Sequence, residues 1–267
     1  MNSVQMARNM RINAVKMVSS GGSSHIGSAL SCIDIVAVLY TNIMQYDINN
    51  PKAVNRDRFI LSKGHAGVCV YTALAEVGFF PREKLSQHYQ NGSCFSGHVS
   101  HKNIPGVELS TGSLGHGLPV GVGMALSAKL DARPNRIFVL IGDGELLEGS
   151  NWEAIFFAAH HKLDNLTLII DRNKLQSIHS TEKTIALEPV SRKFEAFNWQ
   201  TRILDGHNHL QLRSALSTKT EESPSVIIAN TIKGKGVSFM ENRVEWHYKF
   251  PNQEQLEIAL QELEATA

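Results

Sequence analysis

The segment that most constrains the fold of this chain is the run RIFVLIGDGELLEGSNWEA at 136–154. Its apolar, β-prone start at 136–141 is followed by Gly-Asp-Gly-Glu and then by a helical pattern. An apolar strand that leads directly into a helix is typical of a strand buried in a parallel sheet. Further β-rich runs at 166–171 and 225–231 alternate with helical stretches at 151–163 and 208–220. This alternation predicts an α/β fold in which a parallel sheet is flanked by helices.

The rest of the chain shows helical periodicity and no sign of a second domain. Apolar residues recur at helical spacing at 4–18, 32–43, 67–77, 114–130 and 252–265. The last of these stretches is amphipathic, so it can pack either on the domain itself or on a partner. Because the sequence contains no internal repeat, low-complexity tract or obvious linker, we expect residues 1–267 to form a single domain.

Composition argues against several classes of function. The chain has 267 residues, a formal net charge of +1 and no block of Lys or Arg, so a nucleic-acid-binding surface is not expected. The N-terminal residues lack the apolar core of a signal peptide, and we expect no other stretch to approach the length and apolar character of a membrane span. Cys32, Cys69 and Cys94 are too few and too far apart to indicate a disulfide framework or a zinc motif. We therefore expect a cytoplasmic protein that binds neither nucleic acid nor membranes.

Polar residues follow two of the predicted strands and indicate a metal and diphosphate site. Asp143 lies between two glycines at the end of the first strand, and Asn173 follows the strand at 166–171. Ligands of open parallel sheets bind at the carboxyl ends of the strands, and glycines allow a diphosphate to approach the backbone closely. A carboxylate, an amide oxygen and a backbone carbonyl just after Asn173 are oxygen ligands suited to Mg²⁺. The alternative is an ordinary strand-to-helix turn, because Gly, Asp and Asn are also frequent in turns.

Histidines in loops form a second candidate site. Of the twelve histidines, four stand out by their neighbours, which are Gly, Ser or Trp: His25, His65, His98 and His247. A loop histidine with a near-neutral pKa can orient a sugar hydroxyl or a phosphate and can transfer protons. Each one alone is more typical of a surface or capping residue, but four together favour a site.

Two further loops carry features of anion binding. The loop STGSLGHG at 110–117 leads into a helix and offers backbone N–H groups near its N-terminus. Taken alone, it is more typical of an ordinary Gly/Ser-rich helix start. The loop TIKGKG at 231–236 places two lysines between glycines but lacks the P-loop spacing, so it does not indicate a nucleotide site.

Together these motifs resemble those of transketolases, in the same order along the chain. The matching segments are SHIGS, DRFILSKGHA, SGH, PGVELSTGSLGHG, GDGELLEG, DRNKLQSIHST, TIKGKGVSF and EWH. The resemblance covers nearly the whole chain and stops where a transketolase polypeptide continues into a pyrimidine-binding domain and a C-terminal domain. The chain therefore resembles the N-terminal, thiamine diphosphate-binding subunit of a split transketolase, from which those two domains are absent. The implied fold is the diphosphate-binding domain of thiamine enzymes.

The resemblance also implies roles for individual residues. Mg²⁺ would be held by Asp143, Asn173 and the backbone carbonyl of Leu175. The cofactor and its diphosphate would contact Ser28, Lys63, His65, Gly112, Ser113, Leu114, Gly144, Asn173 and Lys233. The catalytic histidines, which would orient the sugar hydroxyls and assist proton transfer, are His25, His98 and His247. Glu148 matches a glutamate at the subunit contact, which is not the acid that activates the cofactor.

Three residues depart from the family pattern. Val99 stands where Pro is frequent, His116 where Gln is frequent, and Tyr248 where Gly is usual. Tyr248 would either narrow the sugar pocket or pack outward. These departures do not affect the cofactor assignment, but they leave the identity of the sugar substrate open. A pentose phosphate, another sugar phosphate and a sulfonated sugar all agree with the sequence.

The implied activity is transfer of a two-carbon ketol unit from a ketose to an aldose, with thiamine diphosphate and Mg²⁺ as cofactors. In the family, a glutamate of the pyrimidine-binding domain activates the cofactor. We therefore expect activity only together with a C-terminal transketolase subunit, in a heterotetramer of two plus two chains. The alternatives are the thiamine-binding subunit of a 2-oxo acid dehydrogenase, a deoxyxylulose-phosphate synthase, and a cofactor-binding scaffold subunit. The histidine loops argue against the first, the division into two chains against the second, and the intact metal motif against the third.

Overall fold

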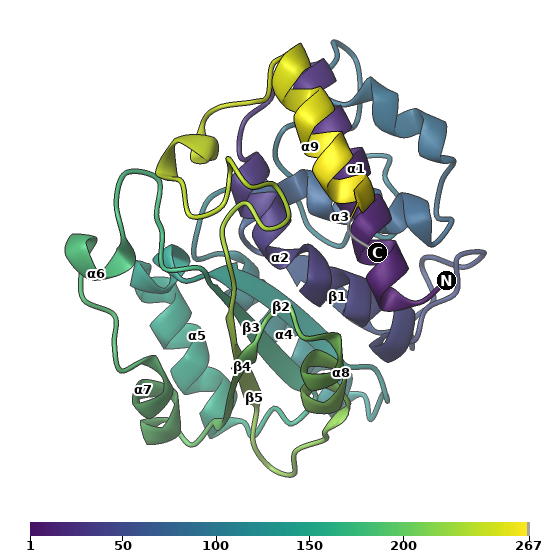
Figure 1. Cartoon of the computed structure of the whole chain (residues 1–267). Helices are drawn as coiled ribbons and strands as arrows, with labels where there is room; N and C mark the ends of the chain where they lie inside the picture. Colours follow the sequence, from purple (N-terminus) through teal and green to yellow (C-terminus); the bar gives the residue numbers. More distant parts are fainter. Residues whose placement is uncertain (266–267) are drawn as a thin grey trace.

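The chain builds a five-stranded parallel sheet in the order β1-β2-β3-β5-β4 (Figure 1). The structure is a computed structural model and describes residues 1–265. The strands are β1 (Arg58–Leu61), β2 (Ile137–Gly142), β3 (Leu166–Arg172), β4 (Gln200–Asp205) and β5 (Ser225–Asn230). The predicted α/β fold, a parallel sheet flanked by helices, is confirmed.

Two of these strands, β1 and β4, were not predicted from the sequence. Both lie at the edges of the sheet, where each pairs with a single neighbour. β1 has four residues, too few for a clear period, and lies in the part of the chain expected to contain helices and loops. β4 is largely accessible, with Ile203 60% exposed, so it lacks the continuous apolar run of a central strand.

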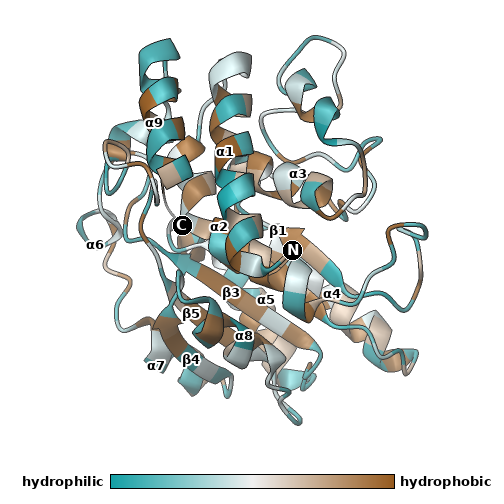
Figure 2. Ribbon diagram, turned by 45° about the vertical axis from the view of Figure 1, so that its right-hand side comes forward, coloured by the Kyte–Doolittle hydropathy of each residue, from teal (hydrophilic) through white to brown (hydrophobic). Residues whose placement is uncertain are grey.

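Helices cover both faces of the sheet (Figures 1 and 2), because side chains alternate between the two faces along each strand. On β2, Phe138 and Leu140 contribute to one core, whereas Val139 and Ile141 contribute to the other. The first core contains α2 (Ile26–Val38), α8 (His209–Ser217), α1 (Ser3–Gly21), α3 (Gly67–Glu76) and α9 (Gln253–Ala265). The second contains α4 (Gly117–Leu130), α5 (Gly149–His160) and α7 (Val190–Ala196), and the short α6 (Thr181–Thr184) follows β3.

Helix α2 belongs to a long apolar helical stretch. Together with the π-helical turn Leu39–Ile43, it forms a stretch, Ile26–Ile43, that is long and apolar enough to cross a membrane by length and composition. The expectation that no stretch has this character was wrong. However, 89% of the stretch is buried inside the molecule, where it packs against α1, α3 and α8. Its composition is therefore that of a core helix.

The C-terminal helix α9 packs on the chain's own core. It lies along α1 (Figure 1), and Ala259 and Leu263 are buried. Arg8 Nε donates a hydrogen bond to the carbonyl of Leu263 at 3.1 Å. Of the two positions left open for this amphipathic helix, the structure shows packing on the domain. The last two residues of the expected single domain, 266–267, lie outside the described residues.

Candidate functional site

A cavity of about 230 Å³ lies at the carboxyl ends of the strands. The residues predicted to bind cofactor, metal and sugar meet there from distant segments of the chain: His25, Ser28, Lys63, His65, His98, Gly112, Leu114, Asp143, Gly144, Asn173, Leu175, Lys233 and His247. Ser113, which was also predicted, is exposed and does not line this cavity. Gly142, Glu145, Gln176 and Ser177 line it as well and were not predicted.

The register of the central strands brings the two polar strand ends together. Gly142 of β2 pairs with Asp171 of β3, so Asp143 and Asn173 leave adjacent strands at the same edge of the sheet. Both side chains are buried, and the Asn173 side-chain oxygen accepts a hydrogen bond from the backbone N–H of Leu175 at 3.0 Å. The predicted cation ligands, a carboxylate, an amide oxygen and a backbone carbonyl, therefore belong to residues that line one cavity.

Two glycines allow the lysine-bearing loops to approach the cavity closely. At Gly64, next to Lys63, a Cβ atom would collide with the backbone of Thr111. At Gly234, next to Lys233, φ is +81° and a Cβ atom would collide with a neighbouring backbone carbonyl. A larger residue at either position would force a lysine-bearing loop to move.

Lys63 forms a buried ion pair with Asp171, a residue without a predicted role. The Lys63 ammonium contacts the Asp171 carboxylate and donates to the carbonyl of Ser28 at 2.9 Å. The hydroxyls of Ser31, at 2.6 Å, and Thr231 also donate to Asp171. Burial alone would lower the pKa of Lys63 and raise that of Asp171, but the opposite charges reverse both shifts. The sequence feature that could have indicated this pair is an acidic residue at the end of a buried strand, because a buried charge needs an oppositely charged partner.

Asp143 is paired with Arg172, a second residue without a predicted role. Arg172 Nη1 donates to Asp143 Oδ2 at 2.9 Å, and the backbone N–H of Lys174 donates to the same oxygen at 2.6 Å. Burial, followed by the negative charge of Asp171, raises the pKa of Asp143. Arg172 is 2% exposed and also pairs with two glutamates, Glu182 of α6 and Glu188, each at 2.9 Å. Its charge therefore remains compensated even without Asp143.

The four loop histidines cluster in the cavity. The ring centroid of His25 lies 5.2 Å from that of His65, 5.5 Å from that of His98 and 4.8 Å from that of His247. His25 has a backbone φ of +74°, in the left-handed region that residues other than glycine seldom adopt. Its backbone N–H donates to the carbonyl of His247 at 3.0 Å. Such backbone strain concentrates at functional sites.

Three of these histidines, His25, His65 and His247, are partly buried next to positive charges, which favours their neutral form at pH 7. Burial, reinforced by neighbouring cationic groups, lowers the pKa of His25 to about 4 and that of His247 to about 3. Burial, followed by the charge of Lys63, also lowers the pKa of His65. Lys233 Nζ lies 3.1 Å from His247 Nδ1, so the ammonium donates and Nδ1 accepts. A neutral His247 ring then keeps its Nε2–H as a donor.

A buried glutamate, Glu145, lines the cavity and was not predicted. The hydroxyl of Ser62 and the backbone N–H groups of Gly115, at 3.0 Å, and Gly142, at 3.3 Å, all donate to its carboxylate. Burial raises the pKa of Glu145, and these hydrogen bonds oppose the shift. Glu148, expected at a subunit contact, is exposed and does not line the cavity.

The three departures from the family pattern occupy different environments. Val99 is buried, and its N–H donates to the carbonyl of Gly64 at 2.9 Å, which supports the loop beside Lys63. His116 is exposed at the start of α4. Tyr248 is 62% exposed, with its ring centroid 4.9 Å from that of His247. Tyr248 therefore flanks the histidine cluster while most of its surface faces solvent.

Two buried polar atoms of the cavity have no hydrogen-bond partner within residues 1–265: His25 Nδ1 and Gln176 Nε2. Because buried polar groups are normally hydrogen-bonded, these atoms fit a polar ligand. Across the same residues, no group of three or more His, Cys, Asp or Glu side chains could hold a metal ion. A cation here would need amide, carbonyl and ligand oxygens besides Asp143, which is the donor set suited to Mg²⁺ and a diphosphate. Such a cavity at the strand ends of a parallel sheet defines a protein that binds a diphosphate cofactor.

Comparison with known proteins identifies the family. Residues 2–261 match the family described as transketolase, thiamine diphosphate binding domain, and the chain belongs to this family. It is 43% identical over 249 residues to one subunit of the apulose-4-phosphate transketolase of Actinobacillus succinogenes, over 92% of this chain and 89% of that protein. It is 41% identical over 245 residues to the 6-deoxy-6-sulfo-D-fructose transketolase subunit SqwG of a Clostridium species, over 91% of this chain and 89% of that protein.

A solved structure extends the comparison to the fold. The transketolase from Leishmania mexicana matches with a TM-score of 0.92 and 28% identity, over 99% of this chain and 41% of that chain. The chain therefore spans less than half of that transketolase. The predicted diphosphate-binding fold and the identification as a transketolase-type transferase subunit that binds thiamine diphosphate are confirmed. A 2-oxo acid dehydrogenase subunit is not favoured.

Proposed function

We propose that this chain is the cofactor-binding subunit of a two-chain transketolase that moves a two-carbon ketol unit from a ketose to an aldose. The observation that carries the proposal is the cavity in which cation ligands, two buried lysines and four clustered histidines meet. Thiamine diphosphate, when bound, supplies the carbanion stabilisation that C–C bond cleavage requires. We also propose that residues 1–267 act as one diphosphate-binding domain, with the pyrimidine-binding and C-terminal domains on another chain.

The proposed Mg²⁺ ligands are Asp143, Asn173 and the backbone carbonyl of Leu175. Diphosphate oxygens and water would complete an octahedron. Because Arg172 also bonds to the Asp143 carboxylate, the cation has to share or displace that contact. A nearby dication favours the ionised carboxylate and so opposes the burial that raises the pKa of Asp143.

The cationic groups of the cavity are proposed to neutralise the diphosphate. Lys63 and Lys233 supply positive charge, and Ser28, His65 and Gly144 are expected to contact the cofactor together with the segment 112–114. His25, His98 and His247 are proposed to face the sugar, where their imidazole rings form hydrogen bonds with hydroxyls. The same rings can move protons to and from sugar oxygens.

A partner subunit is proposed because each acidic residue that lines the cavity already has another role, so none is left to activate the cofactor. Asp143 and Glu145 are the acidic residues that line it within the described part of the chain. Asp143 is the proposed cation ligand, and Glu145 is already bonded to Ser62 and to two backbone N–H groups. An acid that activates the cofactor therefore has to come from a C-terminal transketolase subunit. We propose a cytoplasmic heterotetramer of two chains of each kind.

The proposed donor is a ketose that carries an anionic group, either a phosphate or a sulfonate. This proposal is supported by two relatives, one named for apulose 4-phosphate and the other for 6-deoxy-6-sulfo-D-fructose. Pentose phosphates belong to the same class. The exposed position of Tyr248 beside His247 makes it a candidate for selecting among them.

Ketol transfer tests the proposed function. The assay uses thiamine diphosphate, Mg²⁺, ribose 5-phosphate as acceptor, and xylulose 5-phosphate, apulose 4-phosphate or 6-deoxy-6-sulfo-D-fructose as donor. It compares this chain, a candidate partner with a pyrimidine-binding domain, and their mixture. We expect transfer only in the mixture. Activity of this chain alone would contradict the proposed partner, and decarboxylation of pyruvate by the mixture without ketol transfer would indicate a 2-oxo acid dehydrogenase.

The affinity of the assembled enzyme for thiamine diphosphate is expected to fall as the pH rises above about 8. Burial and then the charge of Lys63 lower the pKa of Lys233 to about 8, so Lys233 loses its positive charge in this range. Below that pH the ammonium is present, and the affinity should not depend on this group. Above it, the Kd should rise by up to about tenfold per pH unit. Fluorescence titrations at constant ionic strength measure this, and Lys233→Gln should remove the pH dependence; an unchanged profile in the variant would contradict the assignment.

A further inference from the structure

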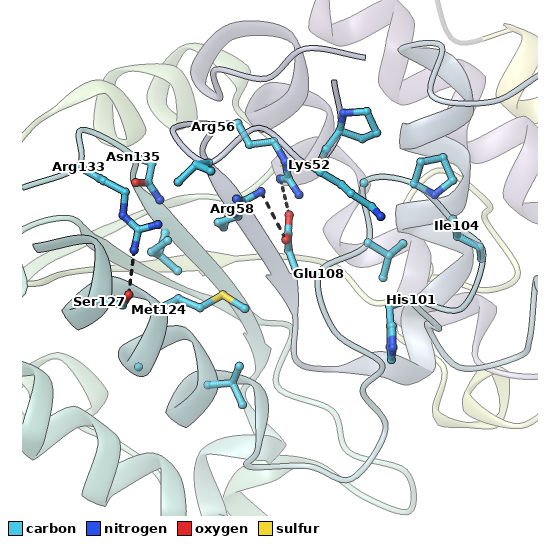
Figure 3. Close-up of a pocket in the computed structure, with 18 residues that line it drawn as sticks. Lys52, Arg56, Arg58, His101, Ile104, Glu108, Met124, Ser127, Arg133 and Asn135 are labelled. Atoms are coloured by element: carbon cyan, nitrogen blue, oxygen red, sulfur yellow. Dashed lines mark hydrogen bonds and ion pairs between the residues drawn. The ribbon is translucent and has the colours of Figure 1, made fainter. Parts of the chain in front are cut away.

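A second cavity, of about 810 Å³, lies at the opposite end of the sheet from the cofactor cavity. Its lining includes the first residues of two strands, Arg58 of β1 and Ile137 of β2, whereas the cofactor cavity lies beyond their carboxyl ends. Its walls come from four segments (Figure 3), which together we call the basic groove: residues 51–58, the loop 101–108, the exposed face of α4, and residues 133–137.

Positive charge dominates the basic groove. Lys52, Arg56, Arg58 and Arg133 line it, and Glu108 is the acid among its described lining residues. Glu108 pairs with Arg56 and lies 3.8 Å from Arg58, as the dashed lines in Figure 3 indicate. Burial lowers the pKa of Arg58, and the charges of Arg56 and Arg133 lower it further although Glu108 opposes them. The cationic groups are therefore crowded, and an anion would relieve their mutual repulsion.

Unpaired buried atoms provide a second and independent sign of a ligand. Asn135 is 4% exposed, and its Oδ1 has no hydrogen-bond partner within residues 1–265; the same holds for the buried Nε of Arg133. The Arg133 guanidinium is held in place by Ser127 at 2.8 Å and by Asp131 at 2.7 Å. Figure 3 shows Arg133 and Asn135 side by side at one end of the groove. Buried polar atoms are normally satisfied, so a ligand oxygen would complete Arg133 Nε, and a 180° turn of the Asn135 amide would direct its NH2 group toward the same ligand.

Apolar walls stand next to these charges. Val54, Ile104, Val107, Val120 and Met124 contribute them from three of the four segments. Val54 is 58% exposed and Val120 is 37% exposed, so part of this apolar surface faces the open groove. A ligand that carried charge alone would leave these apolar side chains in contact with water, whereas a ligand with an apolar body would cover them.

We propose that the basic groove binds a small organic phosphate, in which a phosphate monoester is attached to an apolar body. Guanidinium groups bind phosphate oxygens through paired N–H donors, and Lys52 adds a point charge at the exposed rim. The apolar body packs between the 101–108 loop and α4. This site does not depend on the proposed transketolase activity, because it shares no lining residue with the cofactor cavity.

The loop between the two cavities gives the site a consequence for the enzyme. His101 and residues 104–108 line the basic groove, whereas His98 and Gly112, at the two ends of the same loop, line the cofactor cavity. Glu108 anchors the middle of this loop through its pair with Arg56. A phosphate in the groove competes with Glu108 for the guanidinium groups and so acts on the loop whose two ends line the cofactor cavity.

The test is isothermal titration calorimetry of the full chain with phenyl phosphate, inorganic phosphate and phenol. We expect saturable binding of phenyl phosphate that is tighter than that of either fragment. Lys52→Gln and Arg133→Gln should each weaken it, by about tenfold when combined. The matched control, Lys233→Gln, removes a cation from the cofactor cavity and should leave the Kd within about twofold. Lys52 is exposed, so its variant remains informative if the Arg133 variant fails to fold.

Three results would overturn the proposal. The first is the absence of saturable binding of phenyl phosphate. The second is binding that the Lys233 variant loses and the groove variants keep, which would place the phosphate in the cofactor cavity. The third is loss of binding when the partner chain is added, which would assign the groove to an interface between the two chains.

Discussion

Asp143→Ala is expected to abolish ketol transfer by the assembled enzyme, with a loss well beyond about 100-fold, the upper range for residues that merely support a metal ligand. The change removes the only charged group among the three proposed Mg²⁺ ligands, since Asn173 and Leu175 contribute neutral oxygens. Fold and assembly should persist, because Arg172 keeps its pairs with two glutamates. Activity as a function of Mg²⁺ concentration, thiamine diphosphate affinity and size-exclusion chromatography with the partner together measure the effect.

Asp143→Asn is the matched control for shape. It keeps a side-chain oxygen but removes the charge, so it should retain more cofactor affinity than Asp143→Ala while losing most of the activity. A variant with unchanged Mg²⁺ dependence would refute the metal assignment. A wild-type chain that assembles with its partner but binds no cofactor would instead support a scaffold subunit.

Lys63→Met is expected to lower the free energy of unfolding by about 3–5 kcal/mol, because it leaves the buried Asp171 carboxylate without its cation. Both side chains are almost fully buried, at 2% and 0% exposure, so water cannot replace the lost partner. The two hydroxyl groups that remain bonded to Asp171 are neutral and compensate only part of the charge. Chemical denaturation of the isolated chain measures the loss.

A double-mutant cycle separates this ion pair from simple loss of packing. Lys63→Met with Asp171→Asn removes both charges, and it should be more stable than Lys63→Met alone. If the two single changes added up without coupling, the pair would not be the source of the stability. Because Lys63 also lines the cofactor cavity, the same variants should bind thiamine diphosphate more weakly whatever their stability.

The central strands and the polar residues at their ends were predictable because both are local patterns. β2, β3 and β5 are continuous apolar runs, and the turns that follow them carry Asp143 and Asn173. The edge strands β1 and β4 were missed because one is very short and the other is partly exposed, and so neither has the signature of a buried strand. The four loop histidines were grouped by composition alone, and the structure brings their rings together.

The partners of the buried charges could not be read from the chain. Lys63 and Asp171 are 108 residues apart, and neither sequence segment indicates that the two residues pair. Likewise, the basic groove combines Lys52, Arg58 and Arg133 from separate segments that show no block of basic residues in the sequence. The sequence pattern indicates which face of a strand or helix is apolar, but it does not indicate which loops come into contact once those faces are buried.

The sequence by itself determined the parallel α/β architecture, the polar residues at two strand ends and the family to which these motifs belong, because each depends on short-range periodicity and residue chemistry. Only the tertiary structure decided the charge states of the site. Burial beside Lys63 and Lys233 keeps His25 and His247 neutral, and burial also moves the pKa of Lys233 into the range where it titrates. These shifts arise from desolvation and from charges brought close by folding, and both exist only after distant segments have packed together.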